Sequence, residues 1–337
     1  MLYFESINLA LHDLIRNDSN VILIGEDLLD PYGGAFKVSK GLSTNFPKQV
    51  ISTPISEQAI VGTAIGMAMR GMKPIVEIMF GDFITLCADQ IVNHATKYHW
   101  MFNEQITVPI VIRTPMGGGR GYGPTHSQSL ESMFMSIPGL LIRAPSIFHN
   151  PGEMLKQCVI NNEHPCLFVE NKTIYPKKLI TGDKFEEYIL QRIWKEDAVE
   201  DILLSLYPDE NADVLILTYG GMAELALECA YEMFMDQEMM INVLVVGSVK
   251  PIIKEPIIDH ARSCGRVLVL EEGNKIGGWG AEVASIVHEN TFSSLHAPVE
   301  RVGAADSPIP SAMPMERQVI PSLEVLKKSI NHLFRET

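Results

Sequence analysis

Short runs of hydrophobic residues alternate along the chain with longer segments that resemble helices. Runs without a polar residue at every second position are typical of strands buried on both faces of a parallel sheet. In the first half of the chain we expect such strands at 21–25, 74–79, 109–113, 140–144 and 165–169. We expect helices before or between them at 3–17, 57–70, 82–102 and 150–162. This alternation predicts an α/β domain with a mainly parallel sheet.

The same alternation weakens after residue 175 and restarts near residue 212. Residues 177–211 are rich in charge and carry Gly182 and Pro208, so we interpret them as a linker with one short helix around 184–197. Beyond the linker we expect strands at 213–218, 242–246, 266–270 and 298–302. We expect helices there at 221–237, 254–264, 277–290 and 321–333. The chain is therefore predicted to form two α/β domains, 1–176 and 212–337.

Composition supports a two-domain globular protein and excludes several function classes. The chain has 337 residues, of which 46% are hydrophobic and 20% charged. Its 27 basic and 41 acidic residues give a net charge of −14, which argues against nucleic acid or an anionic membrane as a partner. The five cysteines include no CxxC pair and the first twenty residues contain Glu5 and Asp13, so we expect a reducing compartment and no signal peptide.

Glu57 is the first candidate for chemistry. It is the only charged residue between Lys48 and Arg70, and the helix that follows it is almost wholly hydrophobic. One interpretation is that Glu57 only complements the helix dipole, behind Ser56 as N-cap. The other is that a carboxyl group held in a dry environment serves as a proton donor or hydrogen-bond partner. The residues alone leave both open.

Three further segments could contribute to a site. Residues 116–129 (MGGGRGYGPTHSQS) have five glycines between 117 and 123, followed by His126, and predict a loop whose backbone can move or approach a ligand. The segment matches neither a Walker phosphate loop nor a dinucleotide fingerprint. Residues 77–93 contain Phe83 and other apolar residues that fit a core stripe. Residues 271–282 (EEGNKIGGWGAE) are best interpreted as a tightly packed connection from strand to helix.

Taken in order, seven segments resemble one family, the β subunit of the thiamine-diphosphate-dependent E1 component of 2-oxo acid dehydrogenase complexes. The pyruvate, branched-chain and acetoin enzymes share this subunit. The segments are TPISEQAIVGTAIGMA, PIVEIMFGDFI…ADQIVN, PIVIRTPMGGG…HSQS, PGLLIRAPS, DVLILTYGGM, EEGNKIGGWGAE and ADSPIPSA. The resemblance covers about 3–176 and 212–333, whereas 177–211 matches the family poorly. It implies an N-terminal pyrimidine-binding domain and a C-terminal transketolase-like domain.

The resemblance also implies roles for individual residues. Glu57 matches the glutamate that hydrogen-bonds N1′ of the aminopyrimidine of thiamine diphosphate, and Phe83 matches an aromatic residue that stacks on this ring. His126 matches a histidine near the reacting carbon that assists acyl transfer to a lipoyl group, and Ile55 is expected to contact the same pocket. Some relatives hold a K⁺ ion at positions that match Ile110, Cys158 and Asn161.

One motif of thiamine-diphosphate enzymes is missing from the sequence. The GDG…N motif, which holds Mg²⁺ and the diphosphate, does not occur, since Gly81-Asp82 and Gly182-Asp183 lack the glycine at the third position. The resemblance therefore implies an α subunit that supplies Mg²⁺ binding, an α2β2 assembly, and an E2 lipoyl acyltransferase as partner. We expect a location in the bacterial cytoplasm or an organelle matrix. Two alternatives remain: an acetoin dehydrogenase β subunit and a non-catalytic assembly scaffold.

Overall fold

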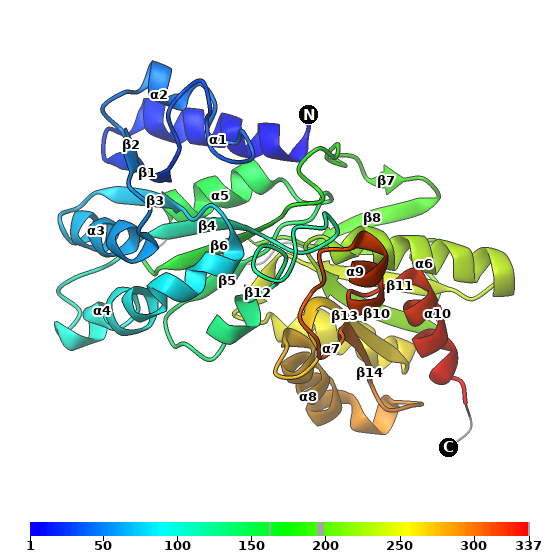
Figure 1. Ribbon diagram of the computed structural model, residues 1–337. Helices are drawn as coiled ribbons and strands as arrows, with labels where there is room; N and C mark the ends of the chain where they lie inside the picture. Colours follow the sequence, from blue (N-terminus) through cyan, green and yellow to red (C-terminus); the bar gives the residue numbers. More distant parts are fainter. Residues whose placement is uncertain (162, 194–198, 336–337) are drawn as a thin grey trace.

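Two sheets form the framework of the molecule. The computed structural model describes residues 1–161, 163–193 and 199–335. In these ranges, one seven-stranded sheet has the order β12-β5-β6-β4-β3-β1-β2 and the other the order β14-β13-β10-β11-β9-β8-β7. Figure 1 shows the sheets in two lobes with helices packed around them. The predicted fold class, two α/β domains with mainly parallel sheets, is confirmed.

The first sheet contains the five strands that the hydrophobic runs predict. Its strands are β1 (Val21–Glu26), β2 (Val50–Thr53), β3 (Lys73–Glu77), β4 (Val111–Met116), β5 (Leu141–Arg143), β6 (Cys166–Asn171) and β12 (Ser248–Lys250). All neighbours pair in parallel except β12, which runs antiparallel to β5. The predictions miss β2 because this edge strand has only one buried residue and no continuous apolar run.

Three of the four helices predicted around this sheet are confirmed. The observed helices are α1 (Tyr3–Asn17), α2 (Leu42–Asn45), α3 (Glu57–Met69), α4 (Tyr98–Met101), α5 (Pro151–Ile160) and the short 3₁₀-helix η3 (Glu131–Phe134). The short α2 and η3 are additional to the prediction. The predicted helix 82–102 is not one α-helix, because the 3₁₀-helix η1 (Gly81–Cys87) and the π-helix η2 (Gln90–Ala95) precede α4. Both η1 and η2 pack against α3, so tertiary contacts rather than helical propensity set this path.

The second sheet extends into the segment that was expected to be a linker. Its strands are β7 (Lys184–Phe185), β8 (Tyr188–Ile193), β9 (Asp201–Ser205), β10 (Val214–Tyr219), β11 (Ile241–Val246), β13 (Val267–Asn274) and β14 (Glu300–Ala304). The helix expected around 184–197 is wrong where the structure describes it, and its positions 194–197 lie outside the described residues. The short β7 and β8 pair antiparallel, and β9 joins them to β11. Cross-strand pairing outweighs the charge of this segment, since Tyr188 and Leu190 are buried on one face.

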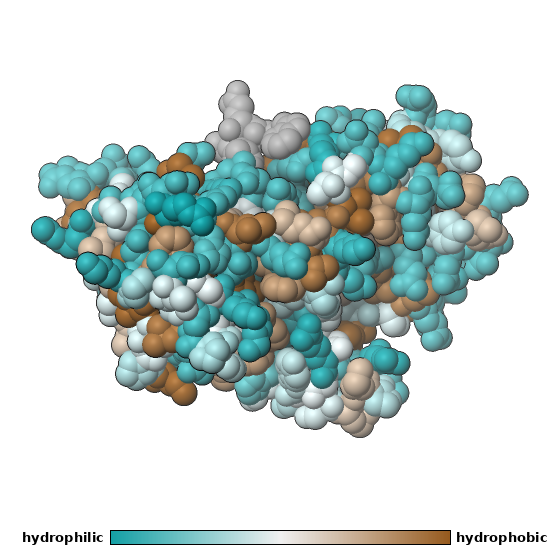
Figure 2. Space-filling view, turned by 90° about the horizontal axis from the view of Figure 1, so that it is seen from above, coloured by the Kyte–Doolittle hydropathy of each residue, from teal (hydrophilic) through white to brown (hydrophobic). Residues whose placement is uncertain are grey.

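Among its described residues, the second half of the chain contains five α-helices and a short 3₁₀ turn. They are α6 (Met222–Gln237), α7 (Lys254–Cys264), α8 (Trp279–Thr291), η4 (Phe292–Ser294), α9 (Met313–Val319) and α10 (Leu323–His332). None of the described helices is long and apolar enough to cross a membrane. Figure 2 shows one face of the molecule, on which hydrophobic side chains lie in small separate groups on a mainly hydrophilic surface.

The two halves interlock through β12. This strand belongs to the second half of the sequence but extends the first sheet beside β5. Arg143 of β5 donates hydrogen bonds from its guanidinium to Ser248 Oγ and, at 2.8 Å, to the Lys250 carbonyl. The buried hydrophobic clusters also contain residues of both halves. The loops of one half are therefore held against the other half at fixed positions.

Candidate active site

The site lies where four neighbouring strands end. The strands β1, β3, β4 and β6 are parallel and adjacent, so the segments that follow them emerge at one edge of the sheet. Ligands of open α/β sheets bind outside the carboxyl ends of the strands. This edge collects Glu26 at the end of β1, Phe80 and Phe83 after β3, the glycine-rich loop after β4, and Lys172 after β6.

Glu57 lies at the first position of α3, and its side chain is buried, with only 5% of the residue exposed. Ser56 occupies the N-cap position, but its side chain makes no capping hydrogen bond. No described residue donates a hydrogen bond to the Glu57 carboxylate. The neighbouring acid Glu26 is also buried, and burial together with the charge of Glu57 raises the pKa of Glu26. Glu57 is thus a buried acceptor with free capacity to bind a ligand.

His126 packs against two phenylalanine rings. Its ring centroid lies 4.7 Å from that of Phe80 and 5.2 Å from that of Phe83, both in edge-on geometry. Phe83 belongs to η1, which packs against α3, the helix that begins at Glu57. Cys87, also in η1, has a pKa raised to about 12 by burial and by the charge of Glu57. The structure therefore brings Phe83 and His126 together, with Glu57 at the start of the adjoining helix.

The loop that carries His126 is glycine-rich because its backbone requires it. Gly117, Gly119, Gly121 and Gly123 all have positive φ angles, between 68° and 96°. Side chains with a Cβ rarely adopt this conformation, so the density of glycines reflects a specific turn rather than freedom of movement. The sequence predicts the loop correctly but not the reason for its composition.

Two buried contacts of this loop are not predicted by the sequence. Lys172, whose exposed fraction is 0%, donates from Nζ to the His126 carbonyl oxygen at 2.6 Å, and burial lowers its pKa to about 8. Buried Asp82 accepts from Gln128 Nε2 at 2.9 Å, and its other oxygen has no partner among the described residues. The only available signal was position, since Lys172 directly follows a buried strand and Asp82 precedes the candidate Phe83.

The remaining predicted residues lie at two places. Ile55 lies two residues before Glu57 and is 81% exposed. Ile110 and Cys158 are buried and meet through Cys166, whose backbone N–H donates to the Ile110 carbonyl at 2.9 Å and whose Sγ lies 3.7 Å from that of Cys158. Asn161 is exposed at the end of α5. The K⁺ site on these residues stays a prediction.

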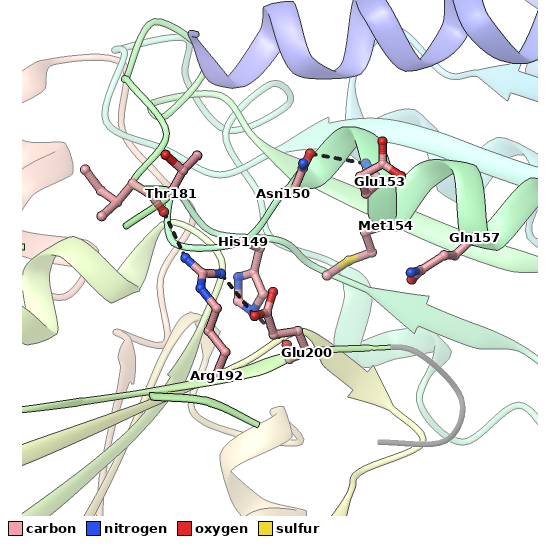
Figure 3. Close-up of a pocket in the computed structure, with 9 residues that line it drawn as sticks. His149, Asn150, Glu153, Met154, Gln157, Thr181, Arg192 and Glu200 are labelled. Carbon is pink, nitrogen blue, oxygen red and sulfur yellow. Dashed lines mark hydrogen bonds and ion pairs between the residues drawn. The ribbon is translucent and has the colours of Figure 1, made fainter. Parts of the chain in front are cut away.

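A separate cavity of about 300 Å³ lies where α5 meets β8 and β9. Figure 3 shows Asn150 and Glu153 on one side of it and Arg192 with Glu200 on the other. Arg192 and Glu200 form an ion pair at 3.0 Å, and burial lowers the pKa of His149 to about 4. None of Glu57, Phe83 and His126 lines this cavity. Its residues join the two halves of the chain rather than serving the candidate site.

Comparison with known proteins identifies the family. The family model "Transketolase, pyrimidine binding domain" matches residues 1–178, and "Transketolase, C-terminal domain" matches residues 206–325. The chain is 36% identical to the 2-oxoisovalerate dehydrogenase subunit beta of Bacillus subtilis (strain 168), over 99% of this chain and 98% of that protein. The chain belongs to the E1 β-subunit family.

Other members of the E1 β family match over nearly the whole chain. The pyruvate dehydrogenase E1 component subunit beta of Rickettsia conorii is 34% identical, with 96% of each chain covered. The beta subunit of acetoin:2,6-dichlorophenolindophenol oxidoreductase of Bacillus subtilis (strain 168) is 32% identical, with 94% of this chain and 92% of that protein covered. A solved split-gene transketolase, described as an inactive β4 tetramer, shares the fold with a TM-score of 0.72 at 20% identity, with 98% and 96% covered.

Membership in the E1 β family implies thiamine diphosphate, and the described residues fit its pyrimidine half. The Glu57 carboxylate is buried without a partner, and the half-buried ring of Phe83 lies at the same edge of the sheet. A carboxylate oxygen and an aromatic face are the contacts that an aminopyrimidine requires. The part of the chain that the structure describes contains no group of three or more His, Cys, Asp or Glu residues placed to hold a metal ion.

Proposed function

We propose that the chain is the β subunit of a thiamine-diphosphate-dependent E1 that acts as an α2β2 tetramer. Its reaction is the oxidative decarboxylation of a 2-oxo acid and acyl transfer to a lipoyl group of E2. The observation that carries this proposal is the buried, unpartnered carboxylate of Glu57 at the start of α3, next to η1 with Phe83. A first-turn acid that served only the helix dipole would have no need of burial.

The roles of the residues follow from their positions. When bound, thiamine diphosphate supplies the electron sink for decarboxylation. Glu57 would hold the pyrimidine by a hydrogen bond at N1′ and move a proton at that atom, and Phe83 would bind the ring through its face. His126, which packs against Phe83, would orient the acyl acceptor. Ile55 would contact the same pocket, where the exposed side chain meets the partner subunit.

Partners must complete the site. Because the sequence has no GDG…N motif, we assign Mg²⁺ and the diphosphate to the α subunit. The lipoyl acyltransferase E2 would receive the acyl group, and the K⁺ ion at Ile110, Cys158 and Asn161 belongs to the same proposal. The complex would work in the cytoplasm of a bacterium or in an organelle matrix.

Co-expression with candidate α subunits tests the proposal. The purified complex is assayed with a dye acceptor on a panel of straight and branched 2-oxo acids and on acetoin. We expect turnover of one class of 2-oxo acid. Turnover of acetoin alone would make the chain an acetoin dehydrogenase β subunit, as its 32% identity to that relative allows. A stable α2β2 complex that binds thiamine diphosphate but is inactive on every substrate would favour an assembly scaffold.

A further inference from the structure

The glycine-rich loop is held by carboxylates of the second half of the chain. The backbone N–H groups of Gly119 and Gly121 donate to the two oxygens of Glu316, each at 2.9 Å. The N–H of Gly118 donates to Glu272 Oε1 at 2.5 Å. Glu316 lies on α9, drawn in red near the middle of Figure 1, and is only 1% exposed. A single buried carboxylate thus accepts two backbone hydrogen bonds from the loop.

The segment 311–316, which leads into α9, lies so close to the loop that it gives a second reason for the glycines. A Cβ atom at Gly123 would lie 2.5 Å from Ser311 Oγ, and one at Gly118 would lie 3.1 Å from Glu316 Oε1. A side chain at Gly121 would also meet the Ser311 carbonyl oxygen at 3.1 Å. The loop therefore lies directly on residues 311–316, and its shape is complementary to that segment.

The other end of the loop is fixed by the first half of the chain. Lys172 donates to the carbonyl oxygen of His126 itself, and the Arg120 guanidinium donates to the Lys172 carbonyl. The His126 ring packs against both Phe80 and Phe83 in T-shaped geometry. Hydrogen bonds to charged groups are stronger than neutral ones, and in a buried site each limits the range of the backbone.

We propose that Glu316 is a positioning residue that sets the place of His126 by holding the Gly119–Gly121 turn. The inference rests on the proposed function for the role of His126, but the contact between Glu316 and the loop stands apart from it. On this view the transketolase C-terminal domain has a task within its own chain, because it completes the active-site loop of the pyrimidine-binding domain. Glu316 does not touch substrate or cofactor.

Glu316→Gln tests the hold directly. Glutamine keeps the size of the side chain but replaces one acceptor oxygen by an NH₂ group, so one of the two hydrogen bonds is lost. Hydrogen exchange of the full chain, co-expressed with its α subunit, should become about 10- to 100-fold faster at whichever of Gly119 and Gly121 loses its acceptor. Gly118, bound by Glu272, should keep its protection. Glu324→Gln, the same change at an exposed position of α10, is the control and should change neither.

A spectroscopic readout reports on His126 without any turnover. The rings of Phe80 and Phe83 shift the NMR signals of the His126 ring, so ¹³C-labelled histidine should show this signal moving toward its unshifted position in Glu316→Gln. Unchanged exchange at Gly119 and Gly121, or an unchanged His126 signal, would overturn the proposal. Both measurements test the role of Glu316 even if the wild-type complex has no activity. An inactive wild-type complex would contradict the proposed function but not the role of Glu316.

A double-mutant cycle with His126→Ala gives the kinetic readout. Glu316→Gln should reduce acyl transfer to lipoyl-E2 more than decarboxylation with an artificial acceptor. When Glu316→Gln is combined with His126→Ala, it should cause almost no further loss of acyl transfer. The effects of two substitutions that act through the same group are not additive. Losses that multiply would contradict the inference and assign Glu316 to general stability.

Discussion

Glu57 shows how the position of a single residue in this fold indicates a function. Its position in the first turn of α3 is favoured by the helix dipole, whereas its burial beside Glu26 is unfavourable for two carboxylates. A residue placed with such a conflict is explained most simply by a ligand that it binds. Glu57→Gln distinguishes ligand binding from a helix-dipole role, because glutamine keeps the shape of the side chain but is not an acid.

Glu57→Gln should lower turnover of the reconstituted complex by about 10²- to 10⁴-fold, because glutamine cannot exchange a proton with the pyrimidine. Cofactor affinity should fall less, since we assign the diphosphate to the α subunit. The measurement is steady-state turnover together with C2 proton exchange of the bound cofactor. Wild-type rates in both would reduce Glu57 to a first-turn helix acid.

His126→Ala should separate two half-reactions. If His126 serves acyl transfer, decarboxylation measured with an artificial acceptor should survive better than transfer to lipoyl-E2. The two assays are run on the same preparation. Equal losses in both would give His126 another role, such as binding the substrate carboxylate.

Glu271 connects a buried acid to the pH dependence of stability. Burial raises its pKa to about 7, although Gly280 N–H donates to it at 3.0 Å. The folded chain retains a proton that the unfolded chain releases near pH 4.5. As the pH rises from 4.5 to 7, the contribution of Glu271 to the free energy of unfolding therefore falls by up to about 3 kcal/mol. When the pH is raised from 5 to 7.5, the free energy of unfolding in urea should fall less for Glu271→Gln than for the wild type. A parallel loss in variant and wild type would refute this assignment.

At the scale of elements, packing decides what the same residue type does in two helices. Gly66 lies in α3 with no atom within 4 Å of a Cβ placed on it. Gly152 lies in α5, where a Cβ would come within 2.4 Å of the Ser6 carbonyl oxygen of α1. The first glycine leaves one face of α3 open, and the second allows α1 and α5 to approach each other.

Gly66→Ala should therefore stabilise the isolated chain by about 0.5–1 kcal/mol through helix propensity. Gly152→Ala should destabilise it by about 1–3 kcal/mol, because the added methyl group forces backbone apart. Urea midpoints of both variants in the absence of partners provide the comparison. A loss of stability in Gly66→Ala would mean that the open face of α3 is covered in the isolated chain.

At the scale of the whole molecule, the two halves act as one unit, whereas we propose that the cofactor site is divided between two chains. The strand β12 and the shared hydrophobic clusters connect the halves, and Glu316 and Glu272 reach across to the loop of the first domain. The proposed pyrimidine contacts, Glu57 and Phe83, belong to this chain, whereas the motif for the diphosphate is missing from its sequence.

The isolated chain should consequently bind thiamine diphosphate weakly, even with Mg²⁺ present. Hydrogen bonding and stacking at the pyrimidine do not replace the metal and the anchoring of the diphosphate. Calorimetry on the chain alone and on the αβ complex makes the comparison. Micromolar, Mg²⁺-dependent binding to the chain alone would disprove the division of the site.

Hydrophobic runs by themselves determined most of the strands, because a strand buried on both faces has to be apolar throughout. They missed β2, β7 and β8, whose few buried residues depend on their neighbours in the sheet. They also missed the three-residue β12 and the strand β9, which is buried throughout but lies in the segment interpreted as a linker. The resemblance likewise predicts Glu57, Phe83 and His126 as site residues, since ligand contacts restrict the residue type at each position.

Tertiary structure alone decided how these residues are held. The sequence predicts a loop from the five glycines, but nothing in it connects that loop to Glu316, almost two hundred positions later. A hydrogen bond between a carboxylate and a distant backbone N–H leaves no periodic pattern, because any residue except proline can supply the donor. The broken helix of 82–102 has the same origin, as packing on α3 sets its geometry. The chain's local preferences thus determine its elements, and contacts between distant segments determine the site.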